Sequence, residues 1–455
     1  MSLIKKTPLE AWIQAKVSED RFEPLTREKI ESYQLQKLKE TIAWAKQRSK
    51  FYRNILTDIE PEDIRSLKEM RMLPFTDSAD VREKGWQFLC VPQDLIHRIV
   101  TLQTSGTTGE KKRIYFTEED QERTIDFFHH GMTSLAQSGD RILILMPGER
   151  PGSVGDLLKK GVERFGAYGI IYGAVKDPKK VWDVLEKESI DIIVGIPQQV
   201  FAVAKYGIPI EKNSTVKIKS VLLSADYVPD AIINELKEKW NCKVFEHYGM
   251  TEMGLGGGVS CEAFQGYHLR EADLYFEVIN PDTGEVLEDG QYGEIVFTTL
   301  TRKGMPLIRY RTGDWGRFLP DSCSCGTILK RLDKIHYRID NSVSLADAEK
   351  LTISELDEIL FAIEGILDFD IVLTNEMDRE CLTVWIYPFL RESVDMKELF
   401  ERAYQSLCTY PKIAALIQKG KLAVEIRQKQ EKPEIYNGMH KRKIFDRRKN
   451  QSEFV

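Results

Sequence analysis

The sequence predicts an α/β protein, with a large N-terminal domain of parallel sheets covered by helices, a small β subdomain, and an α+β C-terminal domain. Three observations support this class. Short apolar runs alternate with amphipathic stretches from about residue 140, hairpin turns follow from about residue 273, and a mixed region begins near residue 331. Strand–helix alternation at this spacing is typical of a parallel sheet with helices on both faces.

The first hundred residues have a helical pattern, because Leu35, Leu38, Ile42 and Ala45 recur at helical spacing with lysine and glutamate between them. The apolar runs predicted as buried strands are 141–146, 169–175, 191–196, 220–225 and 243–247. The amphipathic stretches predicted as helices include 153–165, 178–188 and 229–240. In such sheets ligands bind beyond the carboxyl ends of the strands, so chemistry is expected there.

The remaining third of the chain predicts a hairpin region followed by a compact domain. Runs 274–280 and 293–300 flank Pro-Asp-Thr-Gly and Glu-Asp-Gly turns, which is a hairpin signature. The elements expected after residue 331 are a helix at 346–363, strands at 366–373 and 381–388, a helix at 396–407 and a final strand at 422–427. The predicted domains are 1–332, with the β subdomain at about 260–332, and 333–455.

Composition excludes several classes. The 455 residues are enough for two or three domains, and 65 basic against 71 acidic residues give a net charge of −6, which argues against a nucleic-acid partner. No apolar run is long enough for a membrane span, and the start is no signal peptide. Seven cysteines, an odd number, argue against a disulfide framework, so a cytoplasmic protein is expected.

The strongest local signal is a glycine- and hydroxyl-rich loop between residues 104 and 112. Its glycines let the backbone approach a ligand closely, its hydroxyls offer hydrogen bonds, and Lys112 supplies a charge suited to phosphate. It is not a Walker loop, because no lysine directly follows the second glycine. The alternative is a solvated turn. The loop residues are Thr104, Ser105, Gly106, Thr107, Thr108 and Gly109.

Two further motifs lie where a sheet would bind ligands. The run Glu246-His247-Tyr248-Gly249-Met-Thr251-Glu252 follows the strand predicted at 243–247. Its tyrosine can stack on a base, while Thr251 and Glu252 can serve phosphate and metal. Farther on, Tyr-Arg-Thr-Gly-Asp314 precedes Arg331-Leu-Asp333, and a carboxylate held in a tight turn suits the hydroxyls of a ribose. For Asp314 the alternative is an ordinary Asx turn.

Together, TSGTTG, YGxTE, YRTGD and RxD in this order resemble the adenylate-forming superfamily of acyl-CoA synthetases, adenylation domains and luciferases. The stretch 293–314 resembles the phenylacetate–CoA ligase branch, and the resemblance spans roughly residues 70 to 450. It implies that a carboxylic acid, by default an aryl or arylacetic acid, attacks the α-phosphate of ATP. Pyrophosphate leaves, and the acyl adenylate passes to a thiol, usually coenzyme A, with release of AMP.

The resemblance also implies roles for individual residues. Thr104 to Thr108 and Lys112 would hold the β- and γ-phosphates, in a loop closed by Gly109. The implied contacts of the second loop are Thr251 to the α-phosphate, Glu252 to magnesium and Tyr248 to adenine, with Glu246, His247 and Gly249 beside them.

Asp314, assisted by Arg331, would bind the ribose. Ser224, Ala225 and Asp226 would line the adenine and acyl pocket. Asp333 would be the hinge about which a mobile C-terminal domain rotates. A homodimer is also implied, although no interface follows from the sequence.

The C-terminal region departs from the family pattern. The loop at 336–342 lacks the usual glycine, and the usual Gly-Lys near the end is replaced by Gly438-Met-His-Lys441-Arg-Lys443. Lys441 is the favoured catalytic lysine and Lys443 the next, and the alternative is that both are solvated tail residues. These departures leave open an acceptor other than coenzyme A, or a catalytically impaired nucleotide-binding sensor.

The cysteines are placed unevenly. Cys323 and Cys325 form a C-x-C-G turn, and Cys261 and His268 lie seven apart where the same subdomain opens. Three thiolates and one imidazole are a complete tetrahedral ligand set for structural zinc. The alternative is free thiols, with His268 either a surface residue or partnered by the acidic Glu271 and Asp273. The other four cysteines are expected to be ordinary buried residues: Cys90, Cys242, Cys381 and Cys408.

Overall fold

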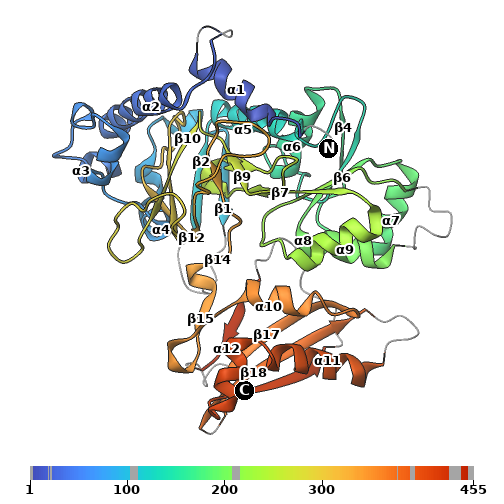
Figure 1. The fold of residues 1–455 in the computed structure, drawn as a ribbon. Coiled ribbons are helices and arrows are strands. Elements are labelled where there is room, and N and C mark those ends of the chain that lie inside the picture. The colour runs from blue at the N-terminus through green and yellow to red at the C-terminus, as the bar shows by residue number, and fades with distance from the viewer. Residues whose placement is uncertain are drawn as a thin grey trace. The chain divides into compact units, whose positions relative to one another are not determined.

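The computed structural model describes residues 4–18, 20, 23–102, 111–207, 216–376, 378–389, 395–429 and 442–448, and its α/β class is the predicted one (Figure 1). Its contacts divide the chain into two compact units. The first unit comprises Met1–Ile171 and Phe245–Ile335, and the second comprises Tyr172–Val244 and His336–Val455.

The first unit begins with helices that pack on its main core. Thr26 caps the longest of them, and Leu38, Ile42 and Ala45 are fully buried, in agreement with the predicted helical spacing. Short 3₁₀ turns follow, the longest being η2 (Leu67–Met72). The α-helices of this region are α1 (Pro8–Val17), α2 (Arg27–Arg48), α3 (Lys50–Ile55) and α4 (Ser78–Lys84).

A β-hairpin and an α/β segment come next in the same unit. Strands β1 and β2 pair antiparallel, with Leu102 opposite Lys112, so the glycine-rich loop joins two paired strand ends. Strands β3 and β4 pair in parallel, and helix α6 packs on both α5 and β4. The elements are β1 (Arg98–Leu102), β2 (Lys112–Phe116), α5 (Glu118–Met132), β3 (Arg141–Ile144), α6 (Val154–Glu163) and β4 (Tyr168–Ile171).

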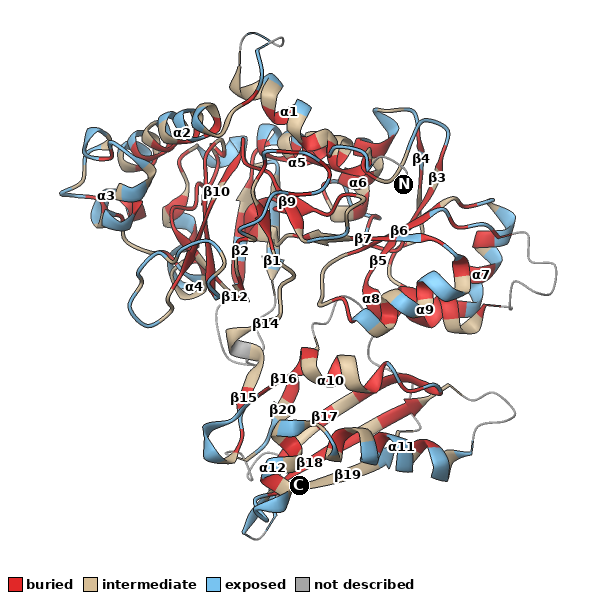
Figure 2. Cartoon of the chain, in the orientation of Figure 1, coloured by how far each residue is buried: buried red, intermediate tan, exposed pale blue. Residues whose placement is uncertain are grey.

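The rest of the first unit is antiparallel. Strand β7 pairs with β8, β8 with β9, and β9 with β13. A second sheet joins β10, β11 and β12, whose residues are largely buried (Figure 2). The strands are β7 (Lys243–Tyr248), β8 (Gly258–Val259), β9 (Tyr267–Leu269), β10 (Leu274–Ile279), β11 (Gly293–Thr299), β12 (Tyr310–Gly316) and β13 (Arg331–Leu332).

In the second unit, residues 172–244 continue the strand–helix alternation. Strands β5 and β6 pair in parallel, and α8 packs on α7, α9 and β5. The strands predicted at 191–196, 220–225 and 243–247 and the helices predicted at 178–188 and 229–240 agree with the structure to within two residues at each end. The strand predicted at 169–175 ends already at Ile171, and helix α8 was not predicted. The elements are α7 (Pro178–Lys187), β5 (Ile192–Gly195), α8 (Pro197–Tyr206), β6 (Ser220–Leu223) and α9 (Asp230–Trp240).

The C-terminal part of the second unit holds a four-stranded sheet in the order β19-β18-β17-β20, with α11 and α12 packed on β19. Its strands and helices are β14 (Tyr337–Arg338), β15 (Ser342–Ser344), β16 (Lys350–Thr352), α10 (Ile353–Leu360), β17 (Ile366–Glu376), β18 (Arg379–Pro388), α11 (Met396–Cys408), α12 (Pro411–Gln418), β19 (Leu422–Gln428) and β20 (Ile444–Asp446).

Two predictions for this part are wrong. The helix expected at 346–363 begins only at Ile353, because Thr352 and Glu355 form a capping box and residues 350–352 pair with β15. The strand at 422–427 is not the last one. Strand β20 follows it and pairs in parallel with β17, as β19 does with β18, so the sheet is mixed.

One buried ion pair connects the N-terminal segment with the second sheet of the first unit. Arg309 donates to both carboxylate oxygens of Glu277 at 3.1 and 3.0 Å, and to the carbonyls of Arg71 and Leu73. Both side chains are at most 2% exposed. Burial raises the pKa of Glu277, and the guanidinium opposes that rise. The pair therefore fixes the residue that directly precedes β12.

None of the helices within the described ranges combines the length and the apolar character that crossing a bilayer requires.

Candidate functional site

Tyr248 and Asp314 form one side of the candidate site. Tyr248 ends β7, and its hydroxyl donates to Asp314 Oδ2 at 2.9 Å. Asp314 is 7% exposed and lies on β12, where Tyr310, Thr312 and Asp314 alternate onto the same buried face. The strand end and the carboxylate singled out in the sequence are therefore hydrogen-bonded to each other.

A buried cation, carboxylate and phenol form the other side. Lys112 Nζ, on β2, is ion-paired with Glu252 Oε1, and both side chains are nearly inaccessible. The Tyr310 hydroxyl donates to Glu252 at 3.4 Å and accepts from Lys112 at 3.3 Å. Sequence reasoning missed Tyr310, although the tyrosine begins the YRTGD motif and shares a strand face with Asp314.

The turn that carries Thr251 and Glu252 is tightly built. A Cβ at Gly249 would lie 2.6 Å from the carbonyl oxygen of Leu255, so only glycine fits there. Thr251 begins the 3₁₀ turn η6 (Thr251–Met253), and Thr124 of α5 donates its hydroxyl to the carbonyl of Gly254 at 2.9 Å. Helix α5 thereby holds the loop that presents Glu252.

His247 precedes Tyr248 and lies among aromatic rings. Its ring centroid is 6.1 Å from that of Phe127 and 6.3 Å from that of Phe128. Burial lowers the pKa of His247 to about 4, so the imidazole is neutral at pH 7. The amide of its neighbour Glu246 donates to Ser260 Oγ. We expect His247 to act as an apolar support for the loop.

The structure gives several predicted residues other surroundings. Arg331 donates to the carbonyls of Gln265 and Asp321 at 2.9 and 2.7 Å, so these hydrogen bonds hold the β subdomain. Its contact with ribose stays a prediction. Asp333 accepts from Arg317 Nε at 2.8 Å, just before the boundary between the units.

The stretch from Ser224 to Asp226 follows β6 in the second unit. Ala225 has a φ of +76°, a left-handed conformation that favours glycine. Asp226 Oδ1 accepts the N–H of Tyr227 at 2.9 Å. These contacts leave the predicted pocket role of the stretch untested.

Seven predicted residues lie outside the described residues: Thr104, Ser105, Gly106, Thr107, Thr108, Gly109 and Lys441.

Two residues of the stretch in which the catalytic lysine was expected are described, Arg442 and the second candidate, Lys443. Arg442 is ion-paired with Asp357 and Asp368, and it donates to the carbonyl of Phe369 at 3.2 Å. Burial raises the pKa of Asp357 to about 7. Lys443 lies 4.9 Å from the ring centroid of Phe445. Arg442 was not among the predicted residues, because in sequence it looks like any other residue of a basic tail.

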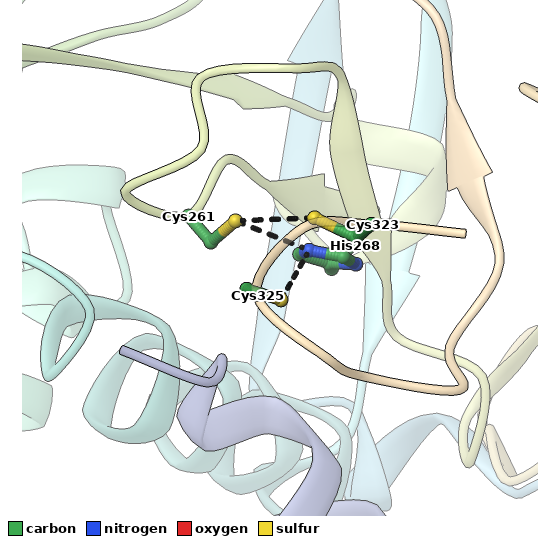
Figure 3. A group of neighbouring side chains, drawn as sticks. All are labelled: Cys261, His268, Cys323 and Cys325. Carbon is green, nitrogen blue, oxygen red and sulfur yellow. Dashed lines mark hydrogen bonds between the residues drawn. The ribbon is translucent and has the colours of Figure 1, made fainter. Parts of the chain in front are cut away.

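The four predicted zinc ligands are brought together in the first unit (Figure 3). The ligand atoms of Cys261, His268, Cys323 and Cys325 all lie within 4.8 Å of one another, and all four residues are buried. The predicted alternative partners of His268 have other contacts: Glu271 pairs with Arg27, and Asp273 with Arg270.

Comparisons with known proteins identify the family of the chain. The family model described as AMP-binding enzyme matches residues 87–300. The phenylacetate–coenzyme A ligase of Thermus thermophilus is 30% identical over 389 residues, covering 81% of this chain and 84% of that one. The Escherichia coli K12 enzyme of the same name is 27% identical, covering 76% and 79%.

Solved structures show the same fold. A 2-hydroxyisobutyryl-CoA ligase in the postadenylation state, in complex with R3-HIB-AMP, matches with a TM-score of 0.76 at 21% identity, over 91% of this chain and 89% of that one. The ligase with 2-HIB-AMP and CoA in the thioesterification state matches with a TM-score of 0.65 at 21% identity, over 94% and 92%.

The fold and the matched motifs define an AMP-binding enzyme of the adenylate-forming superfamily, which confirms the resemblance found in the sequence. Within that class, the extent of the similarity to the Thermus enzyme identifies the family. The chain belongs to the phenylacetate–coenzyme A ligase family of AMP-forming acid–thiol ligases.

The Lys112–Glu252 pair generates a first prediction. Lys112→Met removes the cation that faces a buried carboxylate, so the free energy of unfolding should fall by about 3 kcal/mol. The matched control is Lys111→Met, since Lys111 is exposed, and its effect should stay below about 0.5 kcal/mol. Urea unfolding followed by tryptophan fluorescence measures both. Equal effects of the two substitutions would contradict the ion pair.

His247 generates a prediction about pH. Its pKa of about 4 in the folded chain lies below the ordinary value near 6.5, so the unfolded chain binds more protons between these values. Stability from this residue is complete above about pH 6.5 and is lost as the pH falls toward 4. Between pH 7 and 5 the wild type should lose about 2 kcal/mol more than His247→Gln. Parallel losses in urea titrations at the two pH values would refute the assignment.

Proposed function

We propose that the chain activates a carboxylic acid with ATP as an acyl adenylate, releasing pyrophosphate, and then transfers the acyl group to coenzyme A with release of AMP. The names of the Thermus and Escherichia coli relatives favour an aryl or arylacetic acid as substrate. One observation carries the proposal: two hydrogen-bonded groups of polar side chains come from strands β2, β7 and β12 and from the turn η6, all in one unit.

Each group suits a different part of ATP. Asp314 would accept the ribose hydroxyls, and the hydrogen bond from Tyr248 orients its carboxylate. The Tyr248 ring would pack on adenine. Thr251 would contact the α-phosphate, and the loop from Thr104 to Gly109 would hold the β- and γ-phosphates. Positioning and charge neutralisation of this kind account for most of the catalysis that an adenylation step needs.

Magnesium is the metal that this reaction calls for, and Glu252 is the residue proposed to bind it. A hard cation prefers carboxylate oxygens, and Mg²⁺ with ATP would neutralise phosphate charge. Glu252 is paired with Lys112 in the structure. We infer that Lys112 leaves Glu252 for the phosphates when Mg²⁺–ATP binds, so that one cation replaces another beside a buried carboxylate. Tyr310 would keep the carboxylate oriented during the exchange.

The C-terminal region supplies the remaining proposed groups. Lys441 would polarise the carboxylate and α-phosphate, and Lys443 is the second candidate. Arg442, anchored on Asp357 and Asp368, fixes the chain immediately after Lys441. Asp333 is proposed as the hinge between 1–332 and 333–455. A homodimer and a cytoplasmic location, where thiols stay reduced, complete the proposal.

Zinc at the cysteine cluster has no part in this reaction. Four protein ligands complete a tetrahedral site, which leaves no position for a substrate.

The decisive experiment is ATP–pyrophosphate exchange with a panel of aryl, arylacetic and aliphatic acids, followed by thioester formation with coenzyme A. We expect exchange that depends on an aryl or arylacetic acid and on Mg²⁺, and acyl-CoA as the product. Exchange without acyl-CoA would indicate a different acceptor. Binding of ATP without exchange for any acid would favour the nucleotide sensor.

Asp314 generates a prediction for the same assay. Asp314→Asn loses the charge that accepts the ribose hydroxyls, so the KM for ATP should rise about tenfold or more while the KM for the acid changes little. Asp289→Asn, an exposed aspartate of the same subdomain, is the control. An unchanged KM for ATP in Asp314→Asn would exclude the ribose contact.

A further inference from the structure

We infer that Cys261, His268, Cys323 and Cys325 bind one structural zinc ion, and that this ion fastens the N-terminal helix and strand β9 to the C-x-C turn at Cys323–Cys325. The four ligands come from two segments more than fifty residues apart, and all point toward one centre (Figure 3). The expected effect of the ion on ATP binding rests on the proposed function.

The distances fit a tetrahedral zinc ion. With Zn–S of about 2.3 Å and Zn–N of about 2.05 Å, the edges of the tetrahedron are about 3.8 Å between sulfurs and about 3.6 Å between sulfur and nitrogen. In the structure Cys261 Sγ lies 3.7 Å from Cys323 Sγ. His268 Nε2 lies 3.3 Å from Cys261 Sγ and 3.6 Å from Cys325 Sγ. These three edges lie within about 0.3 Å of the tetrahedral values, and all four ligand atoms lie within 4.8 Å of one another.

The chain also provides donors for negatively charged sulfur. The amide of Ala263 donates to Cys261 Sγ at 3.4 Å, and Cys325 Sγ accepts from the amides of Thr7 and Thr327. Gly326 has a φ of +77°, and its amide donates to the carbonyl of Cys323, which closes the C-x-C turn around the centre. Backbone N–H groups directed at thiolates are the partners that metal-bound cysteines require.

Burial distinguishes this cluster from its alternatives. Cys261, Cys323 and Cys325 are at most 5% exposed and His268 is fully buried, so the ligands are closed to substrate and solvent. A disulfide between Cys261 and Cys323 would need sulfurs about 2.05 Å apart. It would also leave the thiol of Cys325 and the imidazole of His268 without a metal ion to bind. Soft sulfur with one imidazole selects zinc over magnesium or calcium.

The metal centre is attached to the first helix of the chain. Thr7, which donates to Cys325, is also the N-cap of α1 (Pro8–Val17). Glu10 of that helix accepts from Thr327 Oγ1 at 2.6 Å and from the amide of Ile328 at 3.1 Å. Loss of the ion would free the C-x-C turn, and with it the partners that hold the start of α1.

The centre is also two strands from the candidate site. His268 on β9 lies opposite Val259 on β8, which lies opposite His247 on β7. The ring of Tyr267, beside the ligand, is 5.9 Å from the ring of Tyr248, whose hydroxyl binds Asp314. The ion would therefore keep Tyr248 and Asp314 in register, without contacting ATP.

The first test uses the wild-type protein, purified without chelator and under reducing conditions. Elemental analysis should give one zinc per chain. A mercurial should release that zinc, measured with a chromogenic chelator, in proportion to blocked thiols. Protein that contains no zinc and takes up none when zinc salt is added would overturn the inference, as would iron in place of zinc.

The second test compares Cys325→Ser with Cys408→Ser, since Cys408 lies outside the cluster. We expect Cys325→Ser to lose most of its zinc, to lower the unfolding midpoint on the order of 10 °C, and to speed proteolytic cleavage near α1. Cys408→Ser should keep zinc and resist cleavage. Full zinc content in Cys325→Ser, or metal loss without faster cleavage near α1, would contradict the proposed anchoring.

If Cys325→Ser is insoluble, zinc withdrawal from wild-type protein replaces it, with the same proteolysis readout. The consequence for the ATP site is that the KM for ATP should be several-fold higher in zinc-depleted protein and should return to the original value when zinc is added. An unchanged KM for ATP would overturn this coupling. Pyrophosphate exchange by zinc-loaded wild type tests the proposed function separately, so that failure of one proposal does not decide the other.

Discussion

The candidate site depends on the buried ion pair between Arg309 and Glu277. Taking both charges out of water is costly, and the cost is offset only because the guanidinium is hydrogen-bonded by a carboxylate and two carbonyls at once. Arg309 directly precedes β12, and its φ of +47° turns the chain into that strand. The orientation of Tyr310, and through the alternation of β12 that of Asp314, follows from this one fixed residue.

The same physical constraint recurs at the site itself. Glu252 is 2% exposed, so its carboxylate requires a compensating charge in every state of the enzyme. Lys112 provides that charge in the structure, and a divalent cation would provide it during the reaction. Because Glu252 always needs a cation beside it, it would bind metal only when Lys112 can move to a phosphate. Under the proposed function, this arrangement would link metal binding to nucleotide binding without any additional regulatory element.

Much of this organisation follows from sequence patterns. Apolar runs of five to seven residues between amphipathic stretches predicted β3 to β7 and the helices α6, α7 and α9, because burial on both faces of a parallel sheet leaves a strong signal. The helix predicted at 346–363, which corresponds to α10, was begun too early. The apolar residues at 343–351 suit either a helix or a strand, and only the Thr352 cap sets the boundary. Strand β20 was missed because three residues in a basic tail carry too little pattern.

Contacts that depend on tertiary structure were harder to anticipate. Tyr310 could be predicted as a motif residue but not as the partner of Lys112, because the two lie 198 positions apart. Arg442 resembles the other basic residues of the tail in sequence, and nothing local marks it as the partner of the two buried carboxylates Asp357 and Asp368. The four candidate zinc ligands do lie together in space, because soft ligands concentrated in one small subdomain have few other reasons to occur together.

The attachment of α1 to the C-x-C turn has a consequence for biosynthesis. Glu10 and its partner Thr327 are 317 positions apart in the chain. At about 5–20 residues per second, the first helix leaves the ribosome roughly 15–60 s before the segment that receives it exists. Its one buried face, formed by Leu9, Trp12 and Ile13, meets α5 earlier, because Trp12 donates to Asp126, which is only 114 positions away. The hydrogen bond between Glu10 and Thr327 therefore forms long after the helix that it holds has been made.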